Sequence, residues 1–240
     1  MVIDGNGYKW VKQITGIITV FDSGNLDDDT DDRSYLITSN NSNLPNQNIT
    51  AMAVDREGAV WVGTTDGVVI FDCNSLLFDG ACAGNLPVVN QDNFNGNLLE
   101  GEEVRAIAID GGNRTWVGTS NGLFLLDVAE TRYRQLAYFN EANSPLFANE
   151  IQHLAIDDVN GYVYIATDLG LQSIRGEATG GRRRMPDCLG NVFPNPVEPG
   201  YDGPIAISDL PTNANVKITD ASGRLVYETL ALGGHEPRTI

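Results

Sequence analysis

The sequence predicts an all-β protein, with a partial β-propeller of about three and a half four-stranded blades followed by a truncated Ig-like β-sandwich. Three observations lead to this prediction. A segment of about 50 residues recurs along the first part of the chain, a period typical of propeller blades. Glycine and proline, 26 and 10 of the 240 residues, punctuate short apolar runs, as expected for β structure rich in turns. The last part of the chain departs from the repeat.

Three segments of the chain align almost without gaps. They are ITAMAVDREGAVWVGTTDGVVIFD from Ile49, VRAIAIDGGNRTWVGTSNGLFLLD from Val104 and IQHLAIDDVNGYVYIATDLGLQSI from Ile151. The opening, VIDGNGYKWVKQITGIITVFD, fits the later part of the same pattern. In every copy a glycine follows the anchoring aromatic residue by six positions, in the pairs Trp10 and Gly16, Trp61 and Gly67, Trp116 and Gly122, and Tyr164 and Gly170.

Each copy is expected to form three short strands, with a fourth in the variable stretch before the next copy. In the second copy the strands fall at 51–54, 60–62 and 68–71, and the last two are joined by an Asp-Gly turn. One such sheet cannot bury both of its faces, so neighbouring blades stack and complete the core. We therefore expect the repeated aromatics to fill the space between blades and the small residues, including Gly63 and Gly118, to permit close packing.

The motif A-x-D-x-x-G-x-x-W-x-G-T-x-x-G-L resembles the two-component regulator propeller repeat. The resemblance covers about residues 1–175 and weakens where Tyr164 and Ala166 replace Trp and Gly. It implies an extracellular sensor region or a surface protein of Bacteroidetes-like bacteria. An open fan of blades would leave a face uncovered, which favours a fragment of a longer protein.

The repeat pattern ends before residue 176, and residues 176–191 read as a linker. In the remaining segment, 192–240, Pro194 and Pro196 favour an extended backbone at the start. Three short strands are expected after it, at 205–207, 216–218 and 225–227.

Residues 192–234 resemble the C-terminal sorting domain of the type IX secretion system. Four motifs fall in order: FPNPV, IAISDL, NVKITDASGRLVY and LGG. The residues that carry the resemblance are Phe193, Pro194, Asn195, Pro196, Asp220 and Gly223. In the family this domain takes a protein across the outer membrane and positions it at the cell surface. The family continues after the LGG motif with a Trp-Asp-Gly stretch, whereas this chain gives HEPRTI, so the tail is expected to be truncated.

The two resemblances imply an exported, noncatalytic cell-surface scaffold or adaptor of the type IX secretion machinery, associated with the outer membrane. It would aid cargo processing and attachment to lipopolysaccharide. Its implied partners are protein components of the attachment complex, and anionic lipopolysaccharide or a glycan. Two alternatives stay open: an extracellular glycan-binding sensor propeller of a hybrid two-component system, and cargo secreted by the type IX system. The opening MVIDGNGYKW is not a signal peptide, so the expected signal lies outside this sequence.

Composition and motifs argue against several other functions. The formal net charge of −17 would repel nucleic acid and anionic membrane surfaces. No apolar run is long enough for a transmembrane segment. The sequence shows no P-loop, H-E-x-x-H or G-x-S-x-G motif, and His153 is expected to be packed within a strand. We therefore predict neither catalysis nor a cofactor.

Two further features of the sequence are candidate sites. Asp27, Asp29 and Asp31 place oxygen ligands at short spacing in an acidic stretch, a weak calcium candidate. The order of an EF-hand loop is missing, so a solvated loop is favoured and no metal site is predicted. Cys73 and Cys82 lie nine positions apart in one expected loop, where free thiols are expected and a local disulfide is the alternative in an oxidising compartment.

Overall fold

The structure is a computed structural model. It describes residues 1–25, 27–80, 82–91, 94–129, 132–176, 178, 192–193, 201, 206–207, 214–219, 222, 224–230 and 238–239. No helix in this described part is long and apolar enough to cross a membrane. The chain forms two compact units. One comprises residues 1–109, 113–154 and 165–172, and the other comprises residues 110–112, 155–164 and 173–240.

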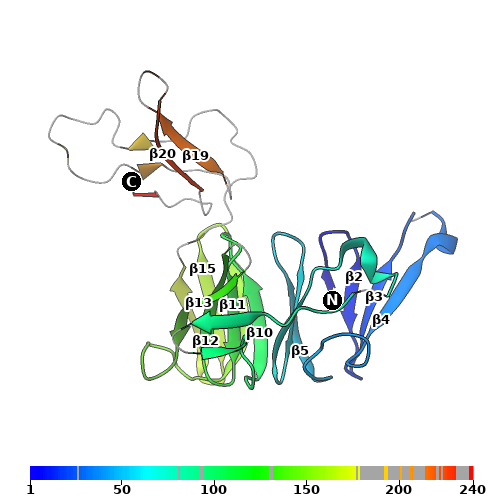
Figure 1. Ribbon diagram of the computed structural model, residues 1–240. Helices are drawn as coiled ribbons and strands as arrows, with labels where there is room; N and C mark the ends of the chain where they lie inside the picture. Colours follow the sequence, from blue (N-terminus) through cyan, green and yellow to red (C-terminus); the bar gives the residue numbers. More distant parts are fainter. Residues whose placement is uncertain are drawn as a thin grey trace. The chain divides into compact units, whose positions relative to one another are not determined.

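The first sheet is built by the opening of the chain, and its strands pair antiparallel in sequence order (Figure 1). They are β1 (Val2–Ile3), β2 (Lys9–Lys12), β3 (Ile18–Asp22) and β4 (Arg33–Ile37), with the short 3-10 helix η1 (Asp29–Asp31) before β4. The sequence predicted only part of a blade here. A first strand of two residues is nevertheless present, because β1 pairs with β2, with Val2 opposite Trp10.

The second sheet contains the first well-matched copy of the repeat. Its strands are β5 (Ile49–Val54), β6 (Val60–Thr64) and β7 (Gly67–Phe71). A single bridge between Ile70 and Asn85 stands where a fourth strand was expected. The chain then adds the 3-10 helix η2 (Asn74–Leu77) and a separate hairpin of β8 (Val88–Gln91) and β9 (Phe94–Asn97).

The remaining copies of the repeat form two more sheets, again in sequence order. The third contains β10 (Val104–Ile109), β11 (Thr115–Thr119), β12 (Leu123–Ala129) and β13 (Arg132–Phe139). The fourth contains β14 (Ile151–Asp157), β15 (Tyr162–Thr167) and β16 (Gly170–Arg175). The all-β prediction is confirmed, and these small antiparallel sheets are consistent with propeller blades.

The apolar core of the first three sheets lies between them. One buried cluster joins Trp10 and Val20 of the first sheet to Val62 and Phe71 of the second. A second cluster joins Trp61 of the second sheet to its neighbours in the third. The second sheet thus packs one side against the first sheet and the other side against the third, as stacked blades require.

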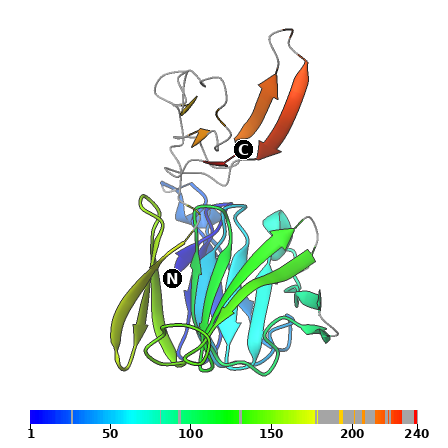
Figure 2. The same ribbon diagram turned by 90° about the vertical axis from the view of Figure 1, so that its left-hand side faces the viewer.

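The tail contributes two small sheets. One consists of β17 (Val192–Phe193), β18 (Ala206–Ile207) and β21 (Arg238–Thr239). The other is the hairpin of β19 (Asn215–Thr219) and β20 (Leu225–Leu230), orange to red in Figure 2. The three strands expected from the sequence coincide with β18, β19 and β20. The described residues do not show the expected Ig-like sandwich, and Pro194, Asn195, Pro196, Asp220 and Gly223 lie outside them.

Candidate functional site

The repeated tryptophan is held by the aspartate six positions before it. Nε1 of Trp10 donates a hydrogen bond to Asp4 at 2.9 Å, and Nε1 of Trp61 donates to Asp55 at 3.1 Å. The second carboxylate oxygen of Asp55 accepts bonds from the backbone N–H groups two and four residues later. The indoles of Trp10 and Trp61 are each 1% exposed. These indoles and carboxylates are therefore engaged in holding the strands and the sheet interface.

The glycine two positions after the tryptophan makes room for the next sheet. A Cβ at Gly118 would lie 2.5 Å from Cγ2 of Ile151, and a Cβ at Gly63 would overlap Cγ1 of Val104. Val104 and Ile151 are the first residues of β10 and β14. The sequence motif thus specifies how closely one sheet approaches the following one.

The later glycine of each copy closes the hairpin, together with a threonine whose role the sequence analysis missed. Gly67 has a φ of +94°, a conformation that side-chain-bearing residues rarely adopt. The hydroxyl of Thr64 donates to the carbonyl of Gly67 at 3.1 Å and accepts from the N–H of Asp66 at 3.1 Å. The same bonds recur at Thr119 and Thr167. The sequence signal for this threonine is the Gly-Thr pair in the repeat motif.

Gly16 keeps the sequence offset but not the same hairpin. Trp10 pairs with Val20, ten positions later, whereas Trp61 pairs with Ile70, nine positions later. The first hairpin is therefore one residue longer. Gly16 still has a positive φ of +77° and would clash with the backbone of Gln47 if it carried a Cβ.

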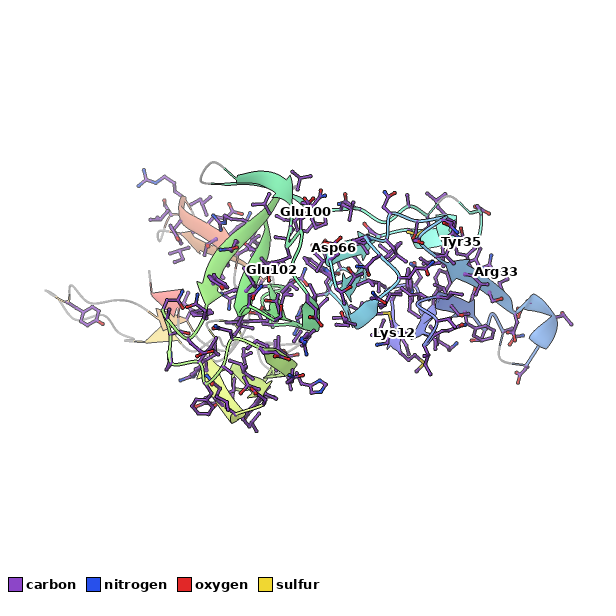
Figure 3. The ribbon with its side chains drawn as sticks, turned by 90° about the horizontal axis from the view of Figure 1, so that it is seen from below. Lys12, Arg33, Tyr35, Asp66, Glu100 and Glu102 are labelled. Atoms are coloured by element: carbon purple, nitrogen blue, oxygen red, sulfur yellow. A yellow bond between two sulfur atoms is a disulfide. The ribbon has the colours of Figure 1, made fainter. Side chains whose placement is uncertain are left out.

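Acidic side chains gather where the Thr64–Gly67 turn meets the segment before β10. Figure 3 shows Asp66, Glu100 and Glu102 near one another on this side of the first unit, and we call these three residues the acidic loop face. The N–H of Gly101 donates to Asp66 at 3.0 Å, and Nδ2 of Asn121 donates to Glu102 at 2.9 Å. These bonds fix a negatively charged surface, suited to a positively charged partner. This surface has no signal in the repeat pattern, because its residues belong to segments that join different copies of the repeat.

A second polar cluster lies on the first sheet. Arg33, labelled in Figure 3, forms an ion pair with Asp22 at 2.6 Å, and its guanidinium lies 4.5 Å from the ring centroid of Phe78. The hydrogen bond from Arg33 holds the pKa of Asp22 below its usual value. Tyr8 packs edge-on against Phe78 at 5.1 Å. The cluster thus ties the first sheet to the loop that follows the second.

That loop is closed by a disulfide between Cys73 and Cys82. The expectation of free thiols is therefore wrong. The physical reason is local: η2 turns the chain within the loop and brings the two Cα atoms to 5.3 Å, within the range that a disulfide requires. Leu77 and Cys82, at 1% and 3% exposure, are buried in the cluster shared by the first two sheets.

The described residues of the weak calcium candidate form hydrogen bonds within their own loop. Asp31 accepts a hydrogen bond from the N–H of Asn25 at 2.9 Å, while the N–H of Asp27 donates to the amide oxygen of Asn25. The side chain of Asp29 lies outside the described atoms. Among the described residues, no group of three or more His, Cys, Asp or Glu is placed to hold a metal ion.

His153 is exposed rather than packed, which corrects the sequence expectation. In the equivalent strands β5 and β10, a register shift follows the first residue. A shift of this kind moves the following residues to the other side of the sheet, so alternation from the first residue of a strand does not fix their burial.

Within the described residues, the carboxyl groups with a shifted pKa all shift downward: Asp22, Asp28, Asp157 and Glu228. Hydrogen bonds to the ionised form are the main cause in each case. A general acid working near neutral pH needs the opposite shift. These four groups are therefore suited to holding turns and strand pairs.

Comparison with known protein families identifies the class of repeat in this chain. Residues 43–66, which span the second sheet's first two strands, match the Two component regulator propeller family. The chain therefore contains a regulator propeller repeat. A search of curated proteins gives no match.

Among solved structures, the chain is similar to PorZ, described as an essential bacterial surface component of the type IX secretion system of Porphyromonas gingivalis. The identity is 30% and the TM-score 0.66, over 99% of this chain and 33% of the PorZ chain. The chain thus spans about a third of PorZ.

Two other structures are less similar. The extracellular domain of the hybrid two component system BT3049 from B. thetaiotaomicron matches at 18% identity and a TM-score of 0.47, over 95% of this chain and 21% of that one. Virginiamycin B lyase from Staphylococcus aureus matches at 11% identity and a TM-score of 0.40, over 95% of this chain and 68% of that one. PorZ and the BT3049 domain are bacterial surface or extracellular proteins.

Proposed function

We propose that the chain acts as a noncatalytic scaffold or adaptor of the type IX secretion system at the bacterial surface. The observation that carries the proposal is the similarity to PorZ, because it extends over 99% of this chain and so takes in both the stacked sheets and the tail. The roles of the repeated residues support it. The aspartates, tryptophans and threonines of the repeat serve packing and turns, which suits a protein that presents surfaces to partners.

We assign partner binding to the acidic loop face. Asp66, Glu100 and Glu102 would attract a basic protein surface and repel anionic lipopolysaccharide. A protein of the attachment complex is therefore the partner proposed for this face, and any contact with lipopolysaccharide belongs elsewhere on the chain. The two small tail sheets are proposed to be parts of the sorting-type sandwich.

The test is genetic, in the source bacterium. The gene is deleted and restored as wild type, as an Asp66→Lys, Glu102→Lys variant, or as a Glu57→Lys control at an exposed acid in another turn. The fraction of cargo that keeps its C-terminal tail is measured by mass spectrometry. We expect the deletion and the double variant to accumulate unprocessed cargo, and the control to behave as wild type.

Normal cargo processing in the deletion strain would rule out the secretion role. Defective processing in the deletion strain with normal processing in the double variant would rule out only the assignment to the acidic loop face.

The regulator propeller match keeps a second candidate, an extracellular sensor that binds a glycan. Isothermal titration against glycan fragments distinguishes it, because a sensor should bind them and its deletion should leave cargo processing unchanged. Cargo is distinguished by the mature protein, which would lack the residues beyond about Val192.

A further inference from the structure

The outer edge of the second sheet is covered by a loop instead of a strand. In the described part of the chain this sheet has three strands, whereas the first and third sheets end in a fourth, β4 and β13. Strand β4 pairs with β3 over its whole length. At the corresponding edge of β7, the described loop contributes a bridge between Ile70 and Asn85, with backbone bonds of 2.9 and 2.7 Å. Backbone pairing therefore holds this loop far less than it holds a strand.

The same loop carries side chains that pack the first sheet onto the second. Leu77 is 1% exposed and lies in the buried cluster that contains Trp10 of the first sheet. Phe78 contacts Tyr8, which directly precedes β2, and Arg33, which begins β4. The packing of the first sheet thus depends on the position of a loop that has little backbone pairing of its own.

The end of the loop approaches β7 closely. A Cβ at Gly84 would overlap Cγ2 of Val69, so the backbone of this residue lies directly on the strand. The carbonyl of Gly84 accepts a hydrogen bond from Nδ2 of Asn43 at 2.7 Å, in the segment between β4 and β5. Gly84 follows Cys82 by two positions, and Cys82 is bonded to Cys73 just beyond β7. The disulfide therefore restricts both ends of the loop to the edge that the loop covers.

We propose that the oxidation state of the Cys73 and Cys82 pair controls how firmly the first sheet packs on the second. The disulfide restricts the loop to the position in which Leu77 is buried. With two thiols the loop is free to leave β7, and the first sheet then opens at this interface while the third sheet stays folded. The chain therefore reaches its fully packed form only in an oxidising compartment. This inference does not depend on the proposed function.

The exposure of the two cysteines determines how the bond is reduced. Cys82 is 3% exposed, whereas Cys73 is half-buried. A thiolate of a dithiol reductant therefore attacks Sγ of Cys73, and Cys82 leaves as a thiolate that takes up a proton. The second thiol of the reductant then displaces Cys73 from the mixed disulfide. Two electrons and two protons thus pass to the chain, and the reductant becomes a disulfide.

Hydrogen exchange of the full chain with and without dithiothreitol, followed by mass spectrometry, tests the proposal. The background is Cys188→Ser, so that only Cys73 and Cys82 can pair. Reduction should accelerate exchange at least about tenfold in peptides over β3, β4 and β7, and should change it less than about twofold in β11 and β12. Alkylation of free thiols verifies the state of the pair under each condition.

Further variants separate the bond from the packing that it maintains. Cys73→Ser with Cys82→Ser should exchange rapidly over β3, β4 and β7 whether or not dithiothreitol is present. Leu77→Ala with the disulfide intact should accelerate exchange in the same peptides, because it removes the buried contact of the loop. Leu76→Ala is the matched control, because Leu76 lies in the same loop and is 54% exposed.

Unchanged exchange over β3 and β4 after complete reduction would overturn the proposal. Equal acceleration over β11 and β12 would also overturn it, because the bond would then hold the whole fold and not one interface. An effect of dithiothreitol on the Cys-to-Ser variant would overturn it as well, since the acceleration would not come from this pair.

Discussion

Gly63 has no Cβ, and this allows the second and third sheets to pack closely. A methyl group at this position would overlap Cγ1 of Val104 on the next sheet. Gly63→Ala should therefore lower the free energy of unfolding by about 1–3 kcal/mol, the usual range for overpacking a filled core. Urea denaturation measures the effect.

A double variant checks the cause. Val104→Ala removes the methyl groups that Gly63→Ala would meet, so the loss in the double variant should be smaller than the sum of the two single losses. Strictly additive losses would show that the two positions are not in contact.

The ion pair of Asp22 with Arg33 should make stability sensitive to acid. Arg33 lowers the pKa of Asp22 in the folded chain, and an aspartate in the unfolded chain titrates near pH 3.9. The stabilisation is therefore present above about pH 4 and is lost as the pH falls through the folded pKa.

Asp22→Asn removes this contribution. Its stability deficit relative to wild type, followed by urea denaturation at several pH values, should be constant near neutrality and shrink in acid. A stability deficit that does not change with pH would mean that the negative charge of Asp22 does not contribute to stability.

The repeat made the packing and turn residues predictable. Prediction from the repeat failed for contacts between residues of different copies. Trp61 and Gly67 recur at a fixed offset, so their burial and their turn follow from one sequence. The bonds of Asp66 and Glu102 run to segments whose lengths differ between copies, so no offset reveals them. His153 is exposed although it alternates with the buried Ile151, so alternation along the strand did not predict its burial.

At the scale of elements, the disulfide loop packs against the first two sheets and helps to hold them together. Its Leu77 is buried in their shared cluster, and its Phe78 contacts both Tyr8 and Arg33. The Cys73–Cys82 disulfide closes a short loop, for which the loss of chain entropy corresponds to about 2–3 kcal/mol. Cys73→Ser with Cys82→Ser should lower the melting temperature accordingly.

The role of the disulfide in positioning this loop can be tested separately. Phe78→Ala should lower the melting temperature of the oxidised protein more than that of the Cys-to-Ser variant, because the released loop no longer holds Phe78 in place. Equal effects of Phe78→Ala in both backgrounds would mean that the disulfide does not position Phe78. Peptide mapping without reductant verifies the bond itself.

Strands outside the repeat were the ones that the sequence could not assign. Strand β1 has only two residues and forms because Val2 pairs with Trp10, a contact with no periodic signal of its own. The β8–β9 hairpin likewise occurs in one copy alone. Strand β13, by contrast, falls in the variable stretch where a fourth strand was expected, since the sheet architecture requires one there.

At the scale of the molecule, stability should be uneven between the stacked sheets and the tail. Every residue of β6 and β11 is buried, so opening them disrupts the apolar clusters between sheets. In β20 all residues but one are exposed, and in β19 exposed and half-buried residues alternate. An isolated two-stranded hairpin of this kind is marginally stable in water.

Hydrogen exchange followed by mass spectrometry should resolve this difference. Peptides over β6 and β11 should exchange through openings close to global unfolding, whereas peptides over β19 and β20 should exchange through local opening and much faster. Raising the urea concentration below the transition should therefore accelerate exchange in β6 and β11 and leave it nearly constant in β19 and β20. If the tail hairpin is as well protected as β6, and equally sensitive to urea, then it unfolds only with the stacked sheets, and the tail is part of one cooperative unit with them.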